Sequence, residues 1–176
     1  MNIELITNEL TENHLNFSNS INDLSVDDYD FSYQEKWNAG QHLDHIIKSV
    51  SVLTKAFAVP KFILKSKFGV ANRASRAPEA LVEKYLDKLK TAKPTPSRFQ
   101  PKVIDFSQKG KAIKKLQKQV DKLCKRALKF SKEELDVYIL PHPLLGKLTL
   151  RELLHFTSYH VKHHKELIDK SLKNKQ

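Results

Sequence analysis

The sequence predicts an all-α protein built as a four-helix bundle, with an additional short helix between the second and third long helices. Apolar residues recur at the three-and-four spacing of an amphipathic helix in four long segments: residues 3–24, 37–58, 107–130 and 149–172. No convincing strand pattern occurs, and the chain holds only four glycines and seven prolines. A length of 176 residues suits one domain with a real core, so we expect residues 1–176 to form a single domain.

The first predicted helix carries a histidine in its apolar stripe. His14 occupies a position where the spacing calls for another hydrophobic residue, so it is either directed into a polar pocket or bonded to a carbonyl or water at the core edge. The second alternative is the commoner one in proteins. The acidic, aromatic stretch at residues 25–32 breaks the periodicity and is predicted to be a loop. The stripe itself consists of Ile3, Ile6, Leu10, Phe17, Ile21 and Leu24.

The second predicted helix begins near Trp37, with Asn38 as its N-cap, and is ended by Pro60. His42 lies about 70° from the centre of its main apolar face at roughly 100° per residue. His45 lies on a second face made of smaller residues. A helix that is apolar on two sides is usually central in a bundle. Periodicity therefore leaves both histidines open as inward-facing residues, with a slight preference for His42.

The stretch from Pro60 to Pro101 follows this helix and has no catalytic role that the sequence identifies. Residues 60–75 are predicted to be short and irregular, residues 78–91 a short helix, and residues 91–101 a loop because three prolines fall there. Two arginines in this stretch, Arg73 and Arg76, would bind an anionic group if their loop folded over a site. The alternative is that they are ordinary surface arginines, as most arginines are.

The third predicted helix has a strongly basic face, and the whole chain has a formal net charge of +11. Such a charge fits either an anionic partner such as nucleic acid or a solvated lysine-rich surface. The face has no aromatic residue to stack on a base and no helix-turn-helix signature precedes it, so we expect a solvated face. The single cysteine, Cys124, lies on the apolar stripe and is predicted to be a core residue. The basic residues are Lys111, Lys114, Lys115, Lys118, Lys122, Lys125, Arg126 and Lys129.

Neither a secretory signal nor a membrane span is evident in the sequence. The start has no basic segment followed by an apolar run, and no apolar stretch approaches the ~20 residues that a span needs. A cytoplasmic location is therefore expected. A two-fold homodimer, the commonest oligomer, is the expected assembly.

The last predicted helix contains the histidine pair on which the functional hypothesis depends. Its start is specified by the capping-box spacing of Thr149 and Glu152, and another such box begins at Ser131. His160 and His164 are four residues apart within an apolar arc, and they therefore stack about 6 Å apart on one helix face. Two hypotheses explain the pair equally well: metal coordination, or core histidines bonded to carbonyls or water.

Two further histidines on this helix fall outside the apolar arc. His163 lies just beyond its edge and His155 on the far side, so both are predicted to be exposed or to stand behind the ligands. Before this helix, residues 140–146 are predicted to be rigid and non-helical because of their prolines.

Three segments resemble a known family. The order of Trp37, His45 and Ser49 matches a Trp-x7-His-x3-Ser segment of the DinB-like superfamily, and residues 143–152 and 160–164 resemble the closing segment of that family. These are metal-dependent helical bundles that include thiol S-transferases. The resemblance implies that His45, rather than His42, is the first metal ligand and that His160 and His164 are the other two.

The function implied by this resemblance is that of a metal-dependent hydrolase or transferase. Three histidines suit zinc or nickel, and also iron or copper, and they leave positions open for water or substrate. A small molecule, and in particular a low-molecular-weight thiol, is the implied substrate. No carboxylate shares the face of His160 and His164, so the sequence identifies no general base. The alternative is a non-catalytic binding module with a structural or absent metal, which an open coordination position beside a cavity would disfavour.

Overall fold

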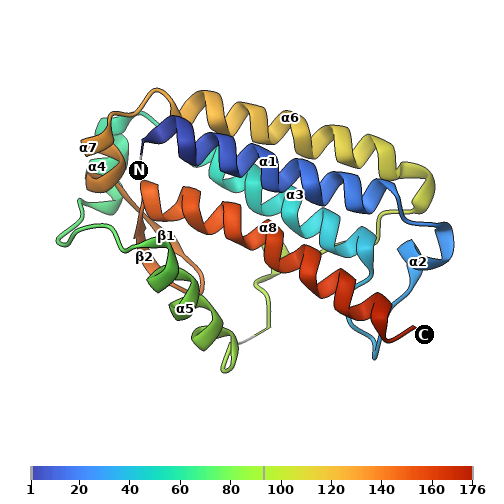
Figure 1. Cartoon of the computed structure of the whole chain (residues 1–176). Helices are drawn as coiled ribbons and strands as arrows, with labels where there is room; N and C mark the ends of the chain where they lie inside the picture. The colour runs from blue at the N-terminus through green and yellow to red at the C-terminus, as the bar shows by residue number, and fades with distance from the viewer. Residues whose placement is uncertain (1, 93, 176) are drawn as a thin grey trace.

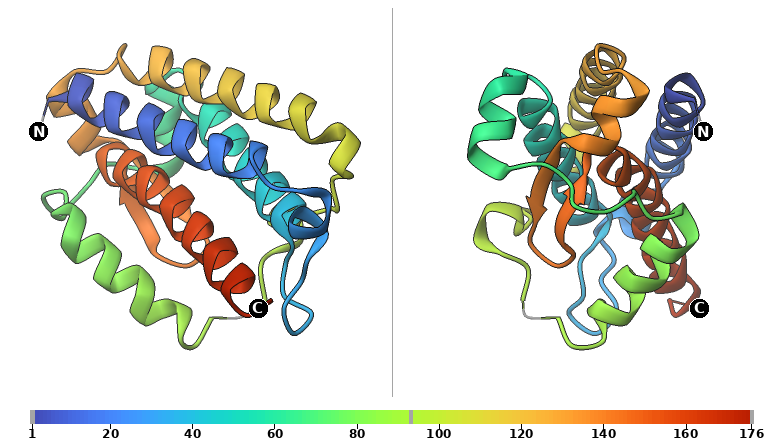
Figure 2. Two further views of the ribbon diagram at one scale, coloured as in Figure 1. Left: turned by 45° about the vertical axis from the view of Figure 1, so that its right-hand side comes forward. Right: turned by 90° about the vertical axis from the view of Figure 1, so that its left-hand side faces the viewer.

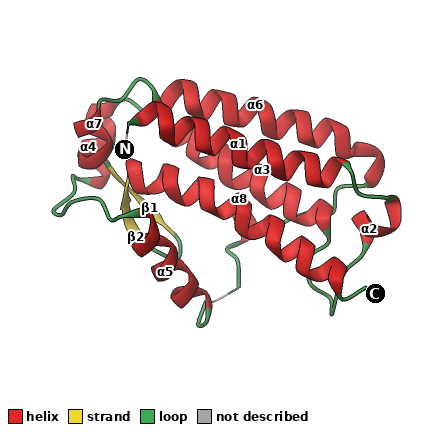
Figure 3. Ribbon diagram, viewed as in Figure 1, coloured by secondary structure: helices red, strands yellow, loops and turns green. Residues whose placement is uncertain are grey.

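Four long helices dominate the computed structural model of the chain, which describes residues 2–92 and 94–175 (Figure 1). They are α1 (Ile3–Asn22), α3 (Ala39–Ala56), α6 (Lys109–Ala127) and α8 (Leu150–Lys173). Helix α1 packs against α6 and α8, and α3 packs against the same two helices, so the four enclose a shared core. The predicted all-α class is therefore confirmed in its broad form (Figure 3).

The core is made by the apolar faces that the periodicity predicted. Each long helix contributes side chains with almost no exposed surface, and burying one such side chain stabilises the fold by roughly 1.5–3 kcal/mol. Leu128, which the predicted stripe of α6 included, is instead exposed because this helix ends at Ala127. The most deeply buried apolar residues of the four helices include Ile6, Leu10, Phe17, Leu43, Ile46, Leu116, Leu123, Leu154 and Val161.

Side-chain caps fix where the helices with histidines begin. The Asn38 side chain accepts a hydrogen bond from the Gln41 backbone N–H, and the Gln41 side chain accepts one from the Asn38 N–H. Thr149 and Glu152 form the same reciprocal box at the start of α8. Because a helix start sets the direction of every later side chain, these caps also set which way the histidines point.

Two segments predicted to be irregular are short helices. Residues 25–32 contain α2 (Val26–Asp30), which Ser25 caps, and residues 60–75 contain α4 (Lys61–Phe68). Helix α4 ends at Gly69, whose φ of 83° is in the region that favours glycine. Two short helices, α4 and α5 (Pro78–Leu89), thus separate α3 from α6 where one was expected. Periodicity missed α4 because its eight residues bury a single side chain, Leu64.

The expectation that the chain has no strand is wrong for a small part of it. Strand β1 (Ile139–His142) pairs antiparallel with β2 (Gly146–Thr149), from Ile139 opposite Thr149 to His142 opposite Gly146. The prolines correctly indicated a non-helical segment but gave no sign of its pairing. The hairpin follows α7 (Lys132–Val137), which Ser131 caps as predicted, and leads directly into α8.

The remaining elements surround the four long helices. Helix α5 lies along α8, and Figure 2 shows both α5 and the hairpin outside the group of four helices. Two 3₁₀ turns, η1 (Ser97–Phe99) and η2 (Phe106–Gln108), lie between α5 and α6, and η1 contacts α3. Within the described residues, no helix is both long and apolar enough to span a membrane.

Candidate metal centre

The structure brings together the three histidines that the resemblance singled out. His45 comes from the second turn of α3, and His160 and His164 come from successive turns of α8. One ring nitrogen of each lies within 4.8 Å of those of the other two, and all three residues are buried. Among the described residues, this is the one cluster of potential ligands close enough to hold a metal ion.

The spacing and orientation of these rings suit coordination. The Nε2 atoms of His160 and His164 are 3.0 Å apart, and two nitrogens on a tetrahedral zinc ion are roughly 3.3 Å apart. Nδ1 of His45 lies 2.8 Å from the Phe99 carbonyl oxygen, to which it donates a hydrogen bond. The proton of His45 is thereby held on Nδ1, which leaves Nε2 with a free lone pair, as is usual for a metal-binding histidine.

His42 lies behind one member of the cluster. Its Nδ1 is 2.7 Å from Nδ1 of His164, while Nε2 of His164 faces His160. His42 therefore lies outside the three-histidine cluster, in a position from which it can orient the ring of His164. Periodicity favoured His42 slightly over His45; both are buried, and they differ in which neighbour they meet.

Burial keeps these histidines neutral. It lowers the pKa of His160 and His164 far below the ordinary value of 6.5, and neighbouring histidines lower it further. Burial also lowers the pKa of His45, against the opposing effects of the Phe99 bond and Asp44. The pKa of His42 falls to about 3 because of burial and the charge of His45. Neutral imidazole is the form that binds metal, so the rings are ready to coordinate at neutral pH.

Aromatic rings enclose the cluster. Trp37 stacks on His164 with ring centres 6.0 Å apart and lies 5.0 Å from the His45 ring. On the opposite side, Phe156 stacks on His160 at 5.0 Å, and Tyr85 of α5 meets His160 edge-on at 6.2 Å. From the sequence, Trp37 was identified only as part of the family motif, and no role was predicted for Phe156 or Tyr85. The positions of Trp37 and Tyr85 follow from tertiary packing, which no local pattern reports, whereas Phe156 lies four residues before His160 and the helical spacing could have placed it there.

A pocket of about 610 Å³ adjoins the cluster. Trp37 and His42 form part of its wall, together with the turn before α3 and the last turns of α8. Lys36, Lys170 and Lys173 also line it, against a single carboxylate from Glu35. The pocket is large enough for a small molecule and would favour an anionic one.

The other histidines on these helices have different surroundings. His14 is buried in the core, with Nδ1 2.7 Å from the Leu10 carbonyl oxygen, as one of its two alternatives predicted. His163 is half-buried beside Tyr85. His155 was predicted to be exposed or behind the ligands, yet it is buried under α5 in a pocket separate from the cluster. That prediction was wrong because α5 covers the far side of α8.

Arg73 and Arg76 have a structural role that neither alternative described. Arg73 donates to both carboxylate oxygens of Glu152 at 2.7 and 2.9 Å, and Arg76 donates to one of them at 3.1 Å. Burial raises the pKa of Glu152, but hydrogen bonds from Arg73, Arg76 and Thr149 outweigh it and lower the pKa to about 2. The two arginines thus bind an anion belonging to the chain itself and tie their loop to the start of α8.

The thiol of the only cysteine is not set up as a nucleophile. Cys124 is half-buried on α6, and burial raises the pKa of its thiol. Its Sγ lies 3.7 Å from the Thr7 carbonyl oxygen. A thiol with a raised pKa is largely protonated at neutral pH and reacts slowly. Cys124 is therefore a packing residue.

Comparison with known proteins identifies the family. A family model described as the DinB superfamily matches residues 9–168, which include all three histidines of the cluster. The chain therefore belongs to the DinB superfamily. The comparisons with curated proteins and with solved structures gave no match.

Proposed function

We propose that the chain is a metal-dependent transferase or hydrolase whose divalent ion is held by His45, His160 and His164. The observation that carries the proposal is the convergence of these three buried, neutral imidazoles from two helices. In this proposal the four long helices form a four-helix bundle, and residues 1–176 make up one domain around the site. Such bundles build metal sites from side chains on facing helices.

The donor set fits a catalytic ion better than a closed structural one. Three protein ligands leave at least one coordination position for an exchangeable group, and three imidazoles suit zinc or nickel. When bound, the ion would supply Lewis-acid chemistry, lowering the pKa of a thiol or water that it contacts. The pocket of about 610 Å³, whose wall includes Trp37 and His42, is the place where we put the small molecule in this proposal.

The residues around the ligands have separate roles in this proposal. The Phe99 carbonyl and His42 hold the rings of His45 and His164 in place. Trp37 and Phe156 limit the access of water, which strengthens electrostatic interactions inside the site.

We propose a low-molecular-weight thiol as the substrate. The lysines of the adjoining pocket, Lys36, Lys170 and Lys173, favour a thiol that carries a carboxylate. In the transfer reaction, the thiol sulfur would form a bond to an electrophilic carbon, the thiol proton would pass to solvent, and the leaving group would depart. The expected cytoplasmic location and homodimer remain predictions, which cell fractionation and light scattering test.

The activity test uses metal-free protein reloaded with zinc or nickel. Consumption of cysteine is measured with 1-chloro-2,4-dinitrobenzene as the electrophile, and ester hydrolysis is measured in parallel. We expect metal-dependent turnover that the His45→Ala variant lowers by a hundredfold or more, a loss larger than the ~10–100-fold typical for residues behind a ligand. The His163→Ala variant, which changes a half-buried histidine of α8 outside the cluster, should keep its rate.

Two results would count against this function. Turnover independent of metal would contradict the proposed role of the three histidines. Tight metal binding without turnover of any thiol or ester would favour the alternative, a non-catalytic module with a structural metal.

A further inference from the structure

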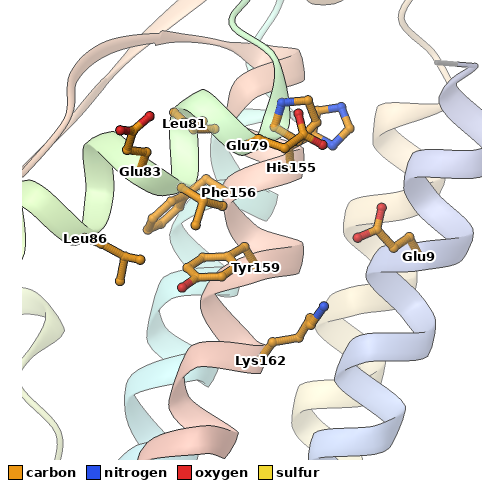
Figure 4. A pocket seen from close by; sticks show the side chains of 11 residues that line it. Glu9, Glu79, Leu81, Glu83, Leu86, His155, Phe156, Tyr159 and Lys162 are labelled. Atoms are coloured by element: carbon orange, nitrogen blue, oxygen red, sulfur yellow. The ribbon is translucent and has the colours of Figure 1, made fainter.

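A second pocket, separate from the three-histidine cluster, lies between α1, α5 and α8 (Figure 4). Its volume is about 450 Å³, within the range of small-molecule sites. Pro78 and five larger apolar or aromatic side chains line it, and Figure 4 shows the rings of Phe156 and Tyr159 facing the side chains of α5. These five residues are Leu81, Val82, Leu86, Phe156 and Tyr159. A ligand here would therefore need an apolar part.

The pocket is acidic on a chain that is otherwise strongly basic. Glu9 comes from α1, Glu79 and Glu83 come from α5, and Lys162 is the one lysine or arginine among the lining residues. The chain as a whole carries a formal charge of +11. A cation is repelled by most of this surface, so a local excess of carboxylates would mark a place selective for cations.

His155 places a hydrogen-bonding ring on the wall of the pocket. It lines the pocket and is only 8% exposed, yet neither ring nitrogen has a hydrogen-bond partner among residues 2–92 and 94–175. Burial lowers the pKa of His155; the charges of Glu9 and Glu79 oppose this effect and the charge of Arg151 adds to it, so the ring is neutral at neutral pH. Neither ring nitrogen is among the fully buried polar atoms that lack a partner, so both are reachable from the pocket, where a ligand can supply the hydrogen bond.

We propose that this pocket binds a small organic ammonium ion that carries an aromatic or aliphatic arm. The ammonium group would lie between the carboxylates of Glu9 and Glu79 and donate a hydrogen bond to the unprotonated nitrogen of His155. The arm would cover Phe156 and Leu86, and the Tyr159 ring adds a cation–π contact within reach of the charge.

An organic cation fits this pocket better than a metal ion. Metal binding requires several ligand atoms within a few ångströms of a single point. Within the described parts of the chain, only the three-histidine cluster meets that requirement, so His155 and the glutamates around it do not converge closely enough. An ammonium group needs fewer direct partners than a metal ion does: one hydrogen bond to His155 can hold it, and the carboxylates attract it from a longer distance.

The binding test compares 2-phenylethylamine with 2-phenylethanol, which has the same arm but no charge. Titration calorimetry and ligand-observed NMR on the full chain should detect the amine and give at least tenfold weaker binding of the alcohol. Equal binding of both compounds, or binding of neither, would overturn the proposal. Chemical-shift changes at Trp37, on the wall of the other pocket, in place of His155 would also overturn it.

Charge variants show whether the carboxylates cause the preference. The Glu79→Gln/Glu83→Gln variant changes two exposed side chains. Each carboxylate charge that is removed should weaken amine binding by about two- to fivefold. The matched control, Glu4→Gln/Glu12→Gln, makes the same charge change on α1 outside the pocket and should leave affinity unchanged. Equal weakening in both variants would contradict a local site.

The His155→Phe variant tests the hydrogen bond. It keeps a buried ring but removes both nitrogens, and it should weaken the amine by roughly tenfold and the alcohol, whose hydroxyl is an uncharged donor, by less. If the variant binds the amine as well as the parent does, His155 is not the acceptor. None of these residues belongs to the three-histidine cluster. Metal content measured on the same samples therefore tests the proposed function independently of amine binding in this pocket.

Discussion

At the scale of single residues, His164 has a neighbour at each of its ring nitrogens. Nε2 lies 3.0 Å from Nε2 of His160, and Nδ1 lies 2.7 Å from Nδ1 of His42. If Nε2 is to give its lone pair to a metal, the proton must be on Nδ1, which then donates to His42. His42 is therefore expected to fix the tautomer of His164 and the direction of its ring.

Replacing His42 by alanine should lower metal affinity by about 10–100-fold, the usual effect of losing a group that orients a ligand. The change leaves the three ligands in place, so binding should weaken without disappearing. Competition against a chromogenic chelator measures the affinity, with His163→Ala on α8 as the control. Unchanged affinity in His42→Ala would show that His164 needs no such support.

At the scale of elements, the caps and stripes predicted the long helices because those signals are local. The boxes at Asn38 and Thr149 set the starts of α3 and α8, and the four-residue spacing placed His160 beside His164. The pattern of α3 alone could not show whether His42 or His45 is the member of the cluster, since both are buried. The distinction depends on η1, a distant segment, which brings the Phe99 carbonyl to His45.

The same limit explains the elements that sequence patterns missed. Helix α4 is too short to show a period, and the β1–β2 hairpin is defined by pairing between its strands. The burial of His155 results from α5, a separate element packed on α8. Each of these features depends on contacts between segments that a helical wheel treats separately.

The start of α8 should be sensitive to the loss of the Glu152 charge. Glu152→Gln leaves Arg73 and Arg76 without their partner, and breaking a buried ion pair costs about 3–5 kcal/mol. Both arginines are about one-third exposed, so we expect a smaller loss of roughly 2–3 kcal/mol. Urea unfolding at pH 7 measures it, with the exposed Glu12→Gln as control. A loss no larger than that of the control would contradict a structural role for this cluster.

The pH dependence of that loss has a defined sign. The pKa of Glu152 is lowered to about 2 in the folded chain, so its contribution is present above the unfolded value near 4.5 and is lost as the pH falls toward 2. The difference in unfolding free energy between parent and Glu152→Gln should therefore shrink across this range. A difference that stays constant from pH 5 to pH 2.5 would contradict the lowered pKa.

At the scale of the whole molecule, the buried histidines should make the metal-free chain sensitive to mild acid. Burial lowers the pKa of His14 to about 4. The unfolded chain then binds more protons than the folded one between about pH 6.5 and 4, so stability falls as the pH falls through this range. His14 alone contributes roughly 3 kcal/mol to this loss.

A His14→Leu variant should show a shallower fall in unfolding free energy between pH 7 and pH 4.5 than the parent does. Leucine keeps an apolar side chain in the core and removes the titrating group. Urea unfolding of metal-free protein at several pH values measures the slope, with the half-buried His163→Leu as comparison. An identical slope in parent and His14→Leu would show that His14 does not titrate as its burial requires.

The central claim is that His45, His160 and His164 together hold one divalent ion. Elemental mass spectrometry on untagged protein tests it most directly, beside a His160→Ala/His164→Ala variant. About one equivalent of zinc or nickel in the parent and none in the variant is the expected result. No metal in the parent, together with no uptake when zinc or nickel is titrated in, would contradict the claim.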